Sequence, residues 1–375
     1  MTTTASVAAF SICRQNRYLF LCLTAFAVLS VLPSYGQTDT VITKQKDKDL
    51  PRRYLSLFEN DEILEVSLRF DLSGFLKKPD KNQSFDGVMT FHFSETDTLN
   101  RKVTIQYRGY SRYERCRLPP MRIIFRQPVY EVSDSARIKK MKLVNQCQPG
   151  ALYDDYVIKE CLVYKLYNVL TDTCFQVRLL KVNYIDAEKK KKPVVQYGIF
   201  IEPEELLAKR TNMLEVKTRS LTQKQMHPLM IDRIAIFNYM VSNWDWSVPG
   251  QHNISVFSSP VYDLAGRGIP VPFDFDLTGI VNAEYAIPPP GIGIETNRDR
   301  KFTGICRTRD EYKTELMMFL DKKDEFYSLV NNYPHLSKAS KRDIINFLDQ
   351  FFLQLEKPRS LDNLIDLLLE ECKQL

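Results

Sequence analysis

Apolar and polar residues alternate along much of the first half of the chain, as they do in strands that bury one face. Alternation, or a short apolar run bounded by polar residues, occurs at 63–70, 87–93, 102–107, 121–125, 141–144, 177–185 and 194–201. Segment 153–170 instead repeats its apolar residues at helical spacing, and Asp154 and Asp155 enrich its first turn. We therefore expect residues 56–205 to form a β-rich region with one long helix.

The second half of the chain, residues 206–375, changes to mostly helical patterns. Apolar residues recur at helical spacing over 231–242, 311–330, 341–355 and 361–373, with short β-like runs at 253–257 and 269–273. Ser340 with Asp343, and Ser360, are suitable N-caps for the last two helices. The predicted fold class is α+β, with a β-rich N-terminal half and a helix-rich C-terminal half.

The N-terminus has the three-part pattern of a secretory signal peptide. Two arginines precede an uncharged apolar run over 18–32, and Ser34 and Gly36 occupy the −3 and −1 positions of a cleavage site. The run is short for a membrane span, which needs about 20 residues; an uncleaved N-terminal anchor is the alternative. We expect a signal peptide over 1–36, a polar linker over 37–55, and a protein that is periplasmic, in the cell envelope or secreted.

Charge and cysteine content narrow the class of protein further. The formal charge of +6 falls to +4 without the two arginines of the expected signal peptide, too little to indicate a nucleic-acid partner. Six cysteines remain and none forms a CxxC pair, which disfavours a zinc knuckle. An even number in an exported protein favours disulfides. Cys116–Cys147 is the best candidate, because both cysteines flank the same expected sheet. For Cys161 and Cys174 the sequence allows either a disulfide or buried free thiols.

The stretch 243–279 concentrates oxygen-bearing side chains around its β-like runs. Asp245, Asn253, Asp274 and Asp276 are the types of ligand that a hard cation such as Mg²⁺ prefers. In an extended F-D-F-D segment residues two apart point to the same side. The two later aspartates are therefore expected to face a cleft together, with the phenylalanines facing the core.

Positively charged residues of the first half could hold phosphate groups. Lys142 lies on an expected strand and Glu160 on the helix that follows, so the two could form an ion pair, with Lys140 as a rival lysine on the same strand face. Arg108 and Arg112 follow the end of another strand. A guanidinium group binds phosphate in a bidentate manner, so these arginines are candidate phosphate ligands.

The order of these motifs resembles that of a known family. The set consists of Arg108-Gly109-Tyr110-Ser111-Arg112, Lys139-Lys140-Met141-Lys142-Leu143, Tyr197-Gly198-Ile199-Phe200-Ile201-Glu202, Asp245, His252-Asn253 and Asp274-Phe275-Asp276. It is similar to the CotH family of secreted and spore-coat protein kinases, whose signatures include Arg-Gly-x-Ser-Ser/Arg and Tyr-Gly-x-Tyr-x-x-x-Glu. The second half of the Arg-Gly signature, and the glycine-rich phosphate loop of ordinary kinases, are not matched.

The resemblance implies a kinase-like two-lobed fold and transfer of the ATP γ-phosphate, with Mg²⁺, to a Ser, Thr or Tyr hydroxyl of a protein substrate. Kinase sites use an acid that orients the hydroxyl, and an Asn and an Asp that hold the metal. Here these would be Asp245, Asn253 and Asp274, with Asp276 as a second or alternative ligand. The Lys142–Glu160 pair would grip the α- and β-phosphates.

Each of these residues also has a purely structural interpretation. Asp245 could accept backbone N–H bonds, Asp274 with Asp276 could cap a helix, and His252 suits a structural hydrogen bond. A catalytically inactive, kinase-shaped binding protein of the cell envelope is therefore the alternative function. A metal-dependent hydrolase is disfavoured because the chain has four histidines and no histidine cluster.

Overall fold

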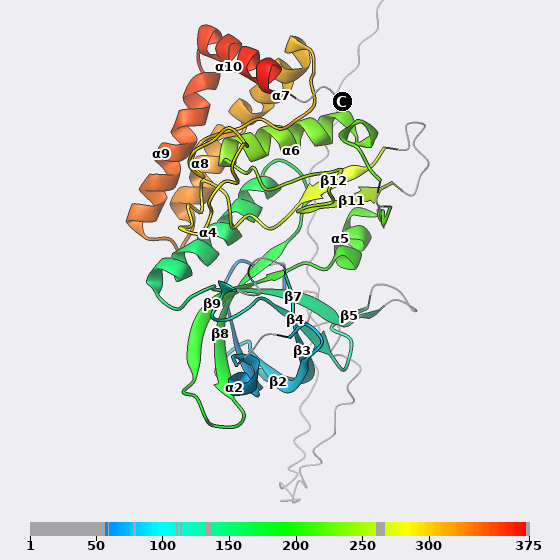
Figure 1. The fold of residues 1–375 in the computed structure, drawn as a ribbon, viewed down its shortest axis with the longest axis vertical. Helices are drawn as coiled ribbons and strands as arrows, with labels where there is room; N and C mark the ends of the chain where they lie inside the picture. The colour runs from blue at the N-terminus through cyan, green and yellow to red at the C-terminus, as the bar shows by residue number, and fades with distance from the viewer. Residues whose placement is uncertain are drawn as a thin grey trace, which may run out of the picture. The chain divides into compact units, whose positions relative to one another are not determined.

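The computed structural model describes residues 57–372 except 59, 78–79, 110–111, 113–114, 132–136, 219 and 260–266 (Figure 1). These described residues belong to one compact unit. The predicted signal peptide and linker lie outside them. Within the described ranges, no helix combines the length and the apolar character needed to cross a membrane.

The β-rich half closes into a seven-stranded barrel with the order β1-β2-β3-β4-β7-β9-β8. Its strands are β1 (Leu64–Phe70), β2 (Ser84–His92), β3 (Thr98–Tyr107), β4 (Met121–Phe125), β7 (Lys140–Asn145), β8 (Val177–Asp186) and β9 (Val194–Ile201). All neighbours pair antiparallel except β1 and β8, whose parallel pairing closes the barrel. The predicted strands are confirmed, and closure is a feature that alternation alone did not predict.

The barrel interior is a continuous apolar core. In β3 every second residue is buried, including Val103 and Ile105, and these side chains meet Phe70, Met89 and Phe200 from other strands. This period of two is the expected signature of a sheet with one buried face. Alternation therefore places the strands correctly, whereas closure depends on a strand pair that is distant in sequence.

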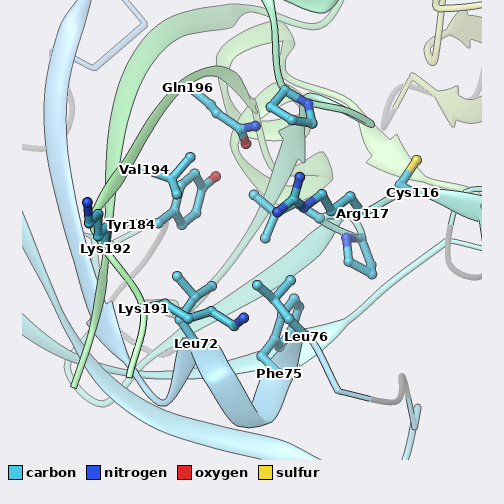
Figure 2. Close-up of a pocket in the computed structure, with 13 residues that line it drawn as sticks. Leu72, Phe75, Leu76, Cys116, Arg117, Tyr184, Lys191, Lys192, Val194 and Gln196 are labelled. Atoms are coloured by element: carbon cyan, nitrogen blue, oxygen red, sulfur yellow. The ribbon is translucent and has the colours of Figure 1, made fainter. Parts of the chain in front are cut away.

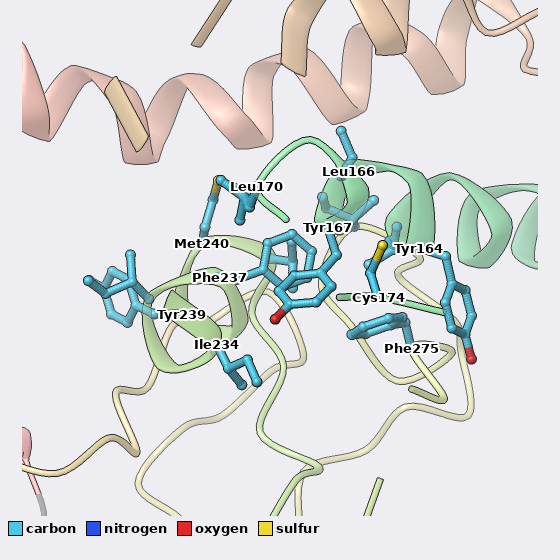
Figure 3. Packing of buried hydrophobic residues seen from close by; sticks show 14 of the residues in the cluster. Tyr164, Leu166, Tyr167, Leu170, Cys174, Ile234, Phe237, Tyr239, Met240 and Phe275 are labelled. Atoms are coloured by element: carbon cyan, nitrogen blue, oxygen red, sulfur yellow. The ribbon is translucent and has the colours of Figure 1, made fainter. Parts of the chain in front are cut away.

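Helix α4 (Ala151–Asn168) packs against β8 and β9 of the barrel and also against a helix of the C-terminal half. Because it contacts both regions, most of its residues are buried rather than one face alone. Figure 3 shows Tyr164 and Tyr167 of this helix beside Phe237 and Phe275. The ring centroids of Tyr167 and Phe237 are 4.9 Å apart, and those of Tyr164 and Phe275 are 4.8 Å apart.

The C-terminal half is mostly helical, as predicted, and carries one small sheet. Its helices are α5 (Glu204–Thr211), α6 (Pro228–Val241), α7 (Arg309–Asp321), α8 (Lys323–Asn332), α9 (Lys338–Leu355) and α10 (Pro358–Glu371). The small sheet has the order β10-β11-β12, from β10 (Leu214–Glu215), β11 (Ile254–Ser258) and β12 (Ile269–Pro272). The remaining short elements are α2 (Leu72–Phe75), η2 (Gln223–Gln225), β5 (Tyr130–Glu131) and β6 (Arg137–Ile138).

Three local predictions in this half are wrong. The helix expected over 311–330 is divided at Lys322 into α7 and α8. Helix α9 is capped by Ser337, whose side chain accepts a hydrogen bond from the Ser340 amide, so Ser340 lies inside the first turn. Helix α10 begins at Pro358, before the predicted cap Ser360, because proline is well suited to the first helical turn.

The cysteines sort into two disulfides and two buried thiols among the described residues. Cys116–Cys147 forms as predicted, and Cys306 pairs with Cys372. Cys161 and Cys174 are free and buried, in line with the thiol alternative. Burial raises the pKa of Cys161 to about 11 and that of Cys174 to about 12. The two disulfides are compatible with an extracellular or periplasmic protein.

Candidate functional site

A group of charged side chains gathers where α4 meets the loops that follow β3 and β12. We call Arg108, Arg112, Glu160, Asp274 and Asp276 the carboxylate–guanidinium cluster. Nη1 of Arg112 lies 3.3 Å from Oδ2 of Asp276, and both side chains are largely buried. Nη2 of Arg112 also donates to the Asn145 carbonyl at 2.7 Å, which ties the loop to the end of β7.

The electrostatics of this cluster are those of acids held close together out of water. Burial, followed by the charges of Asp276 and Asp274, raises the pKa of Glu160 well above its usual range, although Arg112 and Arg108 act to lower it. Burial likewise raises the pKa of Asp276, against the lowering effect of Arg112. The cluster therefore favours the neutral forms of Glu160 and Asp276, despite the two neighbouring arginines.

Several polar atoms of the cluster have no hydrogen-bond partner among the described residues. They are Nη1 of Arg108, Nε of Arg112 and Oε1 of Glu160, and all three are buried. The large majority of buried side-chain polar atoms in folded proteins are paired, so orphaned atoms of this kind call for an explanation. Two unpartnered N–H donors beside an unpartnered carboxylate oxygen would suit a ligand that carries both anionic oxygens and a cation.

The second part of the site is built around Asp245, in the loop after α6. Oδ1 of Asp245 lies 2.7 Å from Nε2 of His252, and Oδ2 accepts from Nδ2 of Asn253 at 3.0 Å. Nδ2 of Asn253 also donates to the Asp245 carbonyl at 2.8 Å. We call Asp245, His252 and Asn253 the Asp245 group. The predicted structural hydrogen bond of His252 is thus present, with Asp245 as its partner.

The two parts of the site are connected through the loop after β12. The Phe273 amide donates to the Asn253 carbonyl at 3.0 Å, and the Asp274 amide donates to the Tyr164 hydroxyl at 2.8 Å. The charge of Asp245 contributes to the raised pKa of Asp276, after burial and the charge of Asp274. The structure therefore brings Asp245 and Asp276 into one charged region.

The predicted F-D-F-D strand is wrong. Strand β12 ends at Pro272, and Asp274 has a φ of 64°, in the left-handed region that an L-residue rarely adopts. A strand's alternation of faces therefore does not apply here. Phe275 is buried as expected, whereas Asp276 is buried against Arg112 and Asp274 is half-buried.

The predicted Lys142–Glu160 ion pair is not formed. Lys142 pairs instead with Glu204, and its Nζ lies 5.0 Å from the centre of the Phe273 ring. The reason is the strand register: Lys142 lies opposite Ile201, so the first turn of α5, three residues further on, comes beside it. The rival Lys140 is exposed. Lys142 nevertheless lies next to the loop that carries Asp274.

The described residues contain no group of three or more His, Cys, Asp or Glu side chains arranged to hold a metal ion. The oxygen donors of Asn253, Asp274 and Asp276 still have the hard chemistry that Mg²⁺ prefers. One of them, Asp276, already faces the guanidinium of Arg112. In this structure the predicted metal ligands are gathered in one region but are not arranged as a finished coordination shell.

Two tyrosines of the site were not predicted from the sequence. The Tyr164 hydroxyl accepts a hydrogen bond from the Asp274 amide, and Tyr285 acts to lower the pKa of Asp276. Tyr164 lies four residues after Glu160, on the same face of α4, so helical spacing could have indicated it. No local pattern marks Tyr285, which lies in the long loop before α7.

Comparison with known proteins shows a distant likeness in structure. No family model and no curated protein matches the chain. Among solved structures, the Helicobacter pylori proinflammatory kinase CtkA is similar at 9% sequence identity and a TM-score of 0.36. The match covers 68% of this chain and 94% of that chain. A likeness at this level carries no argument about activity, so the candidate site is judged by its own geometry.

Proposed function

We propose that the protein is a CotH-like atypical protein kinase that transfers the γ-phosphate of ATP, with Mg²⁺, to a hydroxyl of a protein substrate outside the cytoplasm. The observation that supports this most is the set of orphaned buried atoms of Arg108, Arg112 and Glu160, in a cluster whose Asp276 also feels the charge of Asp245. In this proposal the barrel is the nucleotide-binding lobe of a kinase-like two-lobed fold, and the helical half is the second lobe.

The residues present suit both parts of Mg·ATP. The free N–H groups of Arg108 and Arg112 match phosphate oxygens, which guanidinium binds with charge-assisted hydrogen bonds. Asn253, Asp274 and Asp276 would hold the metal, and Glu160 supplies the unpartnered oxygen nearby. When bound, the metal would neutralise charge that develops on the phosphate oxygens.

The Asp245 group would orient the hydroxyl of the protein substrate. The carboxylate of Asp245 would accept the hydrogen bond of the substrate hydroxyl and orient its oxygen toward the phosphate. His252, at 2.7 Å from Oδ1, and Asn253, at 3.0 Å from Oδ2, keep that carboxylate in place. The exposed side chain of His252 makes this the solvent-facing side of the site, where a protein substrate can approach.

The proposal is tested with two variants of the purified protein. Asp274→Ala should remove Mg²⁺-dependent ATP binding, measured by isothermal titration calorimetry. Asp245→Ala should keep binding within a few-fold and abolish phosphate transfer, measured with labelled ATP and a general protein acceptor. Glu188→Ala, an exposed acid in the β8–β9 turn, is the matched control for loss of one charge. Unchanged binding and transfer in both site variants would overturn the proposal.

A binding protein without catalysis is the second candidate, and specific observations favour it. Lys142 is held by Glu204 rather than Glu160, and Asp245 already has two hydrogen-bond partners. An exported protein also meets little ATP. ATP binding that Asp274→Ala removes, without transfer to any acceptor by the wild-type protein, would support this candidate and reject the kinase.

A further inference from the structure

A cavity of about 580 Å³ opens at the end of the barrel where α2 lies. Its lining comes from α2, the segment after the cluster arginines, and the β8–β9 hairpin (Figure 2). This volume falls within the roughly 300–1,000 Å³ typical of small-molecule sites. None of the residues of the carboxylate–guanidinium cluster or the Asp245 group lines it, so it is separate from the proposed nucleotide site.

The walls of this cavity are mostly apolar. The apolar lining residues are Leu72, Phe75, Leu76, Leu118, Pro119, Pro149 and Val194. Apolar walls of this kind favour a ligand with an apolar body, because transfer of its surface from water is favourable.

One lining residue, Gln196, brings a polar atom with no partner. Its side chain is 6% exposed, and its Oε1 has no hydrogen-bond donor among the described residues. The neighbouring Tyr184 hydroxyl cannot serve it, because that hydroxyl donates to Oδ1 of Asn145 at 2.8 Å. In Figure 2 the Gln196 amide and the Tyr184 ring face the same space. A bound ligand with an N–H or O–H group would satisfy this acceptor.

Positive charge surrounds the opening. Arg117, Lys191 and Lys192 line the cavity, and their charged groups form no ion pair with any residue that the structure describes. The two acids of the hairpin have other partners. The Asp186 carboxylate accepts hydrogen bonds from the amides of Ser73, Lys190 and Lys191 at 2.8–3.2 Å, and Glu188 pairs with Lys190 at 3.7 Å. Unpaired cations around an apolar cavity favour a ligand with an anionic end.

We propose that this cavity binds a small amphipathic anion. The apolar body of the ligand occupies the space between α2 and Val194, and a hydrogen-bond donor meets Oε1 of Gln196. Its anionic group lies at the opening, next to Arg117, Lys191 and Lys192. The inference is independent of the proposed kinase activity, because the two sites share no residue.

Two probes that differ by one charged group test this site. 1-Anilinonaphthalene-8-sulfonate has an apolar ring system, an N–H donor and a sulfonate, and N-phenyl-1-naphthylamine has the same rings and N–H without the sulfonate. We expect the sulfonate probe to bind the folded protein at one site, measured by fluorescence titration. Val194→Trp, which fills the opening, should weaken both probes at least tenfold, whereas Leu353→Trp, at an exposed position on α9, should weaken neither.

Variants that remove charge distinguish the contribution of the cations at the opening to probe binding from that of the apolar walls. The triple variant Arg117→Gln, Lys191→Gln, Lys192→Gln should weaken the sulfonate probe at least tenfold and leave the neutral probe within twofold. A matched triple variant at exposed positions, Lys313→Gln, Lys338→Gln, Arg359→Gln, should change neither. Gln196→Leu should weaken both probes about fivefold, as expected for one hydrogen bond. Circular dichroism would show that each variant is folded.

Three results would overturn the proposal. The first is the absence of saturable binding of the sulfonate probe to the folded protein. The second is unchanged binding in Val194→Trp, which would place the probe elsewhere. The third is equal weakening by the two triple variants, which would show that the probe responds to overall charge rather than to this opening.

Discussion

Two buried groups of acids and arginines in this protein have similar composition and very different hydrogen bonding. Glu202 is 1% exposed and accepts Nε and Nη2 of Arg210 at 3.1 and 3.0 Å, together with the Gln176 amide at 3.0 Å. Glu160 is also 1% exposed, but its Oε1 has no partner among the described residues. The two carboxylates are therefore equally buried, but only Glu202 has hydrogen-bond partners for both of its oxygens.

This difference distinguishes an ion pair whose hydrogen bonds are complete from a cluster that has unused donors and acceptors. The Glu202–Arg210 pair joins the end of β9 to α5 and, through the carbonyls of Asp172 and Cys174, to the loop before β8. It is complete without a ligand. The carboxylate–guanidinium cluster has unused donors and acceptors, which a folded protein retains at a cost in stability. The binding role that we propose would account for that cost.

We expect the largest change in stability from a substitution in the Glu202–Arg210 pair. Glu202→Gln should lower the free energy of unfolding by about 3 kcal/mol, because it leaves a partly buried guanidinium without its counter-charge. Urea denaturation monitored by circular dichroism measures this. A change below about 0.5 kcal/mol would show that the pair contributes no more than a surface ion pair.

The Cys174 thiol reports the same effect independently. Cys174 is 1% exposed, and its backbone carbonyl accepts a hydrogen bond from Nη2 of Arg210. Loosening of the Glu202–Arg210 pair should therefore expose the thiol. Labelling by a thiol reagent should be very slow in the wild-type protein, since burial raises the pKa of Cys174 to about 12. We expect Glu202→Gln to accelerate labelling about 100-fold, in proportion to the lost stability. Glu160→Gln, which we expect to stabilise the protein slightly, should not accelerate labelling.

The next effect concerns the incomplete cluster and its proposed ligand. Arg112→Lys keeps the charge but loses the planar fork that binds phosphate. We expect ATP affinity in the presence of Mg²⁺ to fall about tenfold, measured by calorimetry. Arg210→Lys, the same change in the complete pair, should leave ATP affinity unaltered; equal losses in the two variants would remove the distinction between the groups.

The smallest expected effect has the opposite sign. Glu160→Gln should stabilise the protein by about 1 kcal/mol at pH 7, since a neutral amide avoids the cost of keeping an ionisable carboxyl buried without a full set of partners. Because burial raises the folded-state pKa of Glu160, its contribution to stability is fully present below the unfolded-state pKa and is lost as pH rises from there toward the folded-state value. The advantage of the variant should therefore be absent near pH 4 and grow toward neutral pH. Destabilisation across that range would mean that Glu160 is satisfied.

The sequence predicted the local structure well because alternation and helical spacing are local properties. All the strands of the barrel lie where apolar alternation or short apolar runs placed them, and α4 and α6 begin within a few residues of the expected positions. Closure of the barrel was not predictable in this way. It depends on parallel pairing of Val66 with Val182, and no local pattern identifies such a distant partner.

The candidate site was predicted in part for the same reason. Spacing along the chain brought Asp245, Asn253 and Asp276 into one region, because the loops that carry them flank the small sheet. The Lys142–Glu160 pair failed because strand register, not spacing, decides which acid lies beside Lys142. The left-handed backbone at Asp274 likewise overrides the alternation expected of its sequence.

We propose that the carboxylate–guanidinium cluster has unused donors and acceptors because it binds Mg·ATP. A thermal unfolding titration of the purified protein measures this binding. A ligand that binds only the folded state raises the melting temperature, by an amount corresponding to about 2.7 kcal/mol at 100 times its dissociation constant. We predict a rise of several degrees at millimolar ATP with Mg²⁺, and none in Asp274→Ala. An unchanged melting temperature in the wild-type protein would contradict the claim.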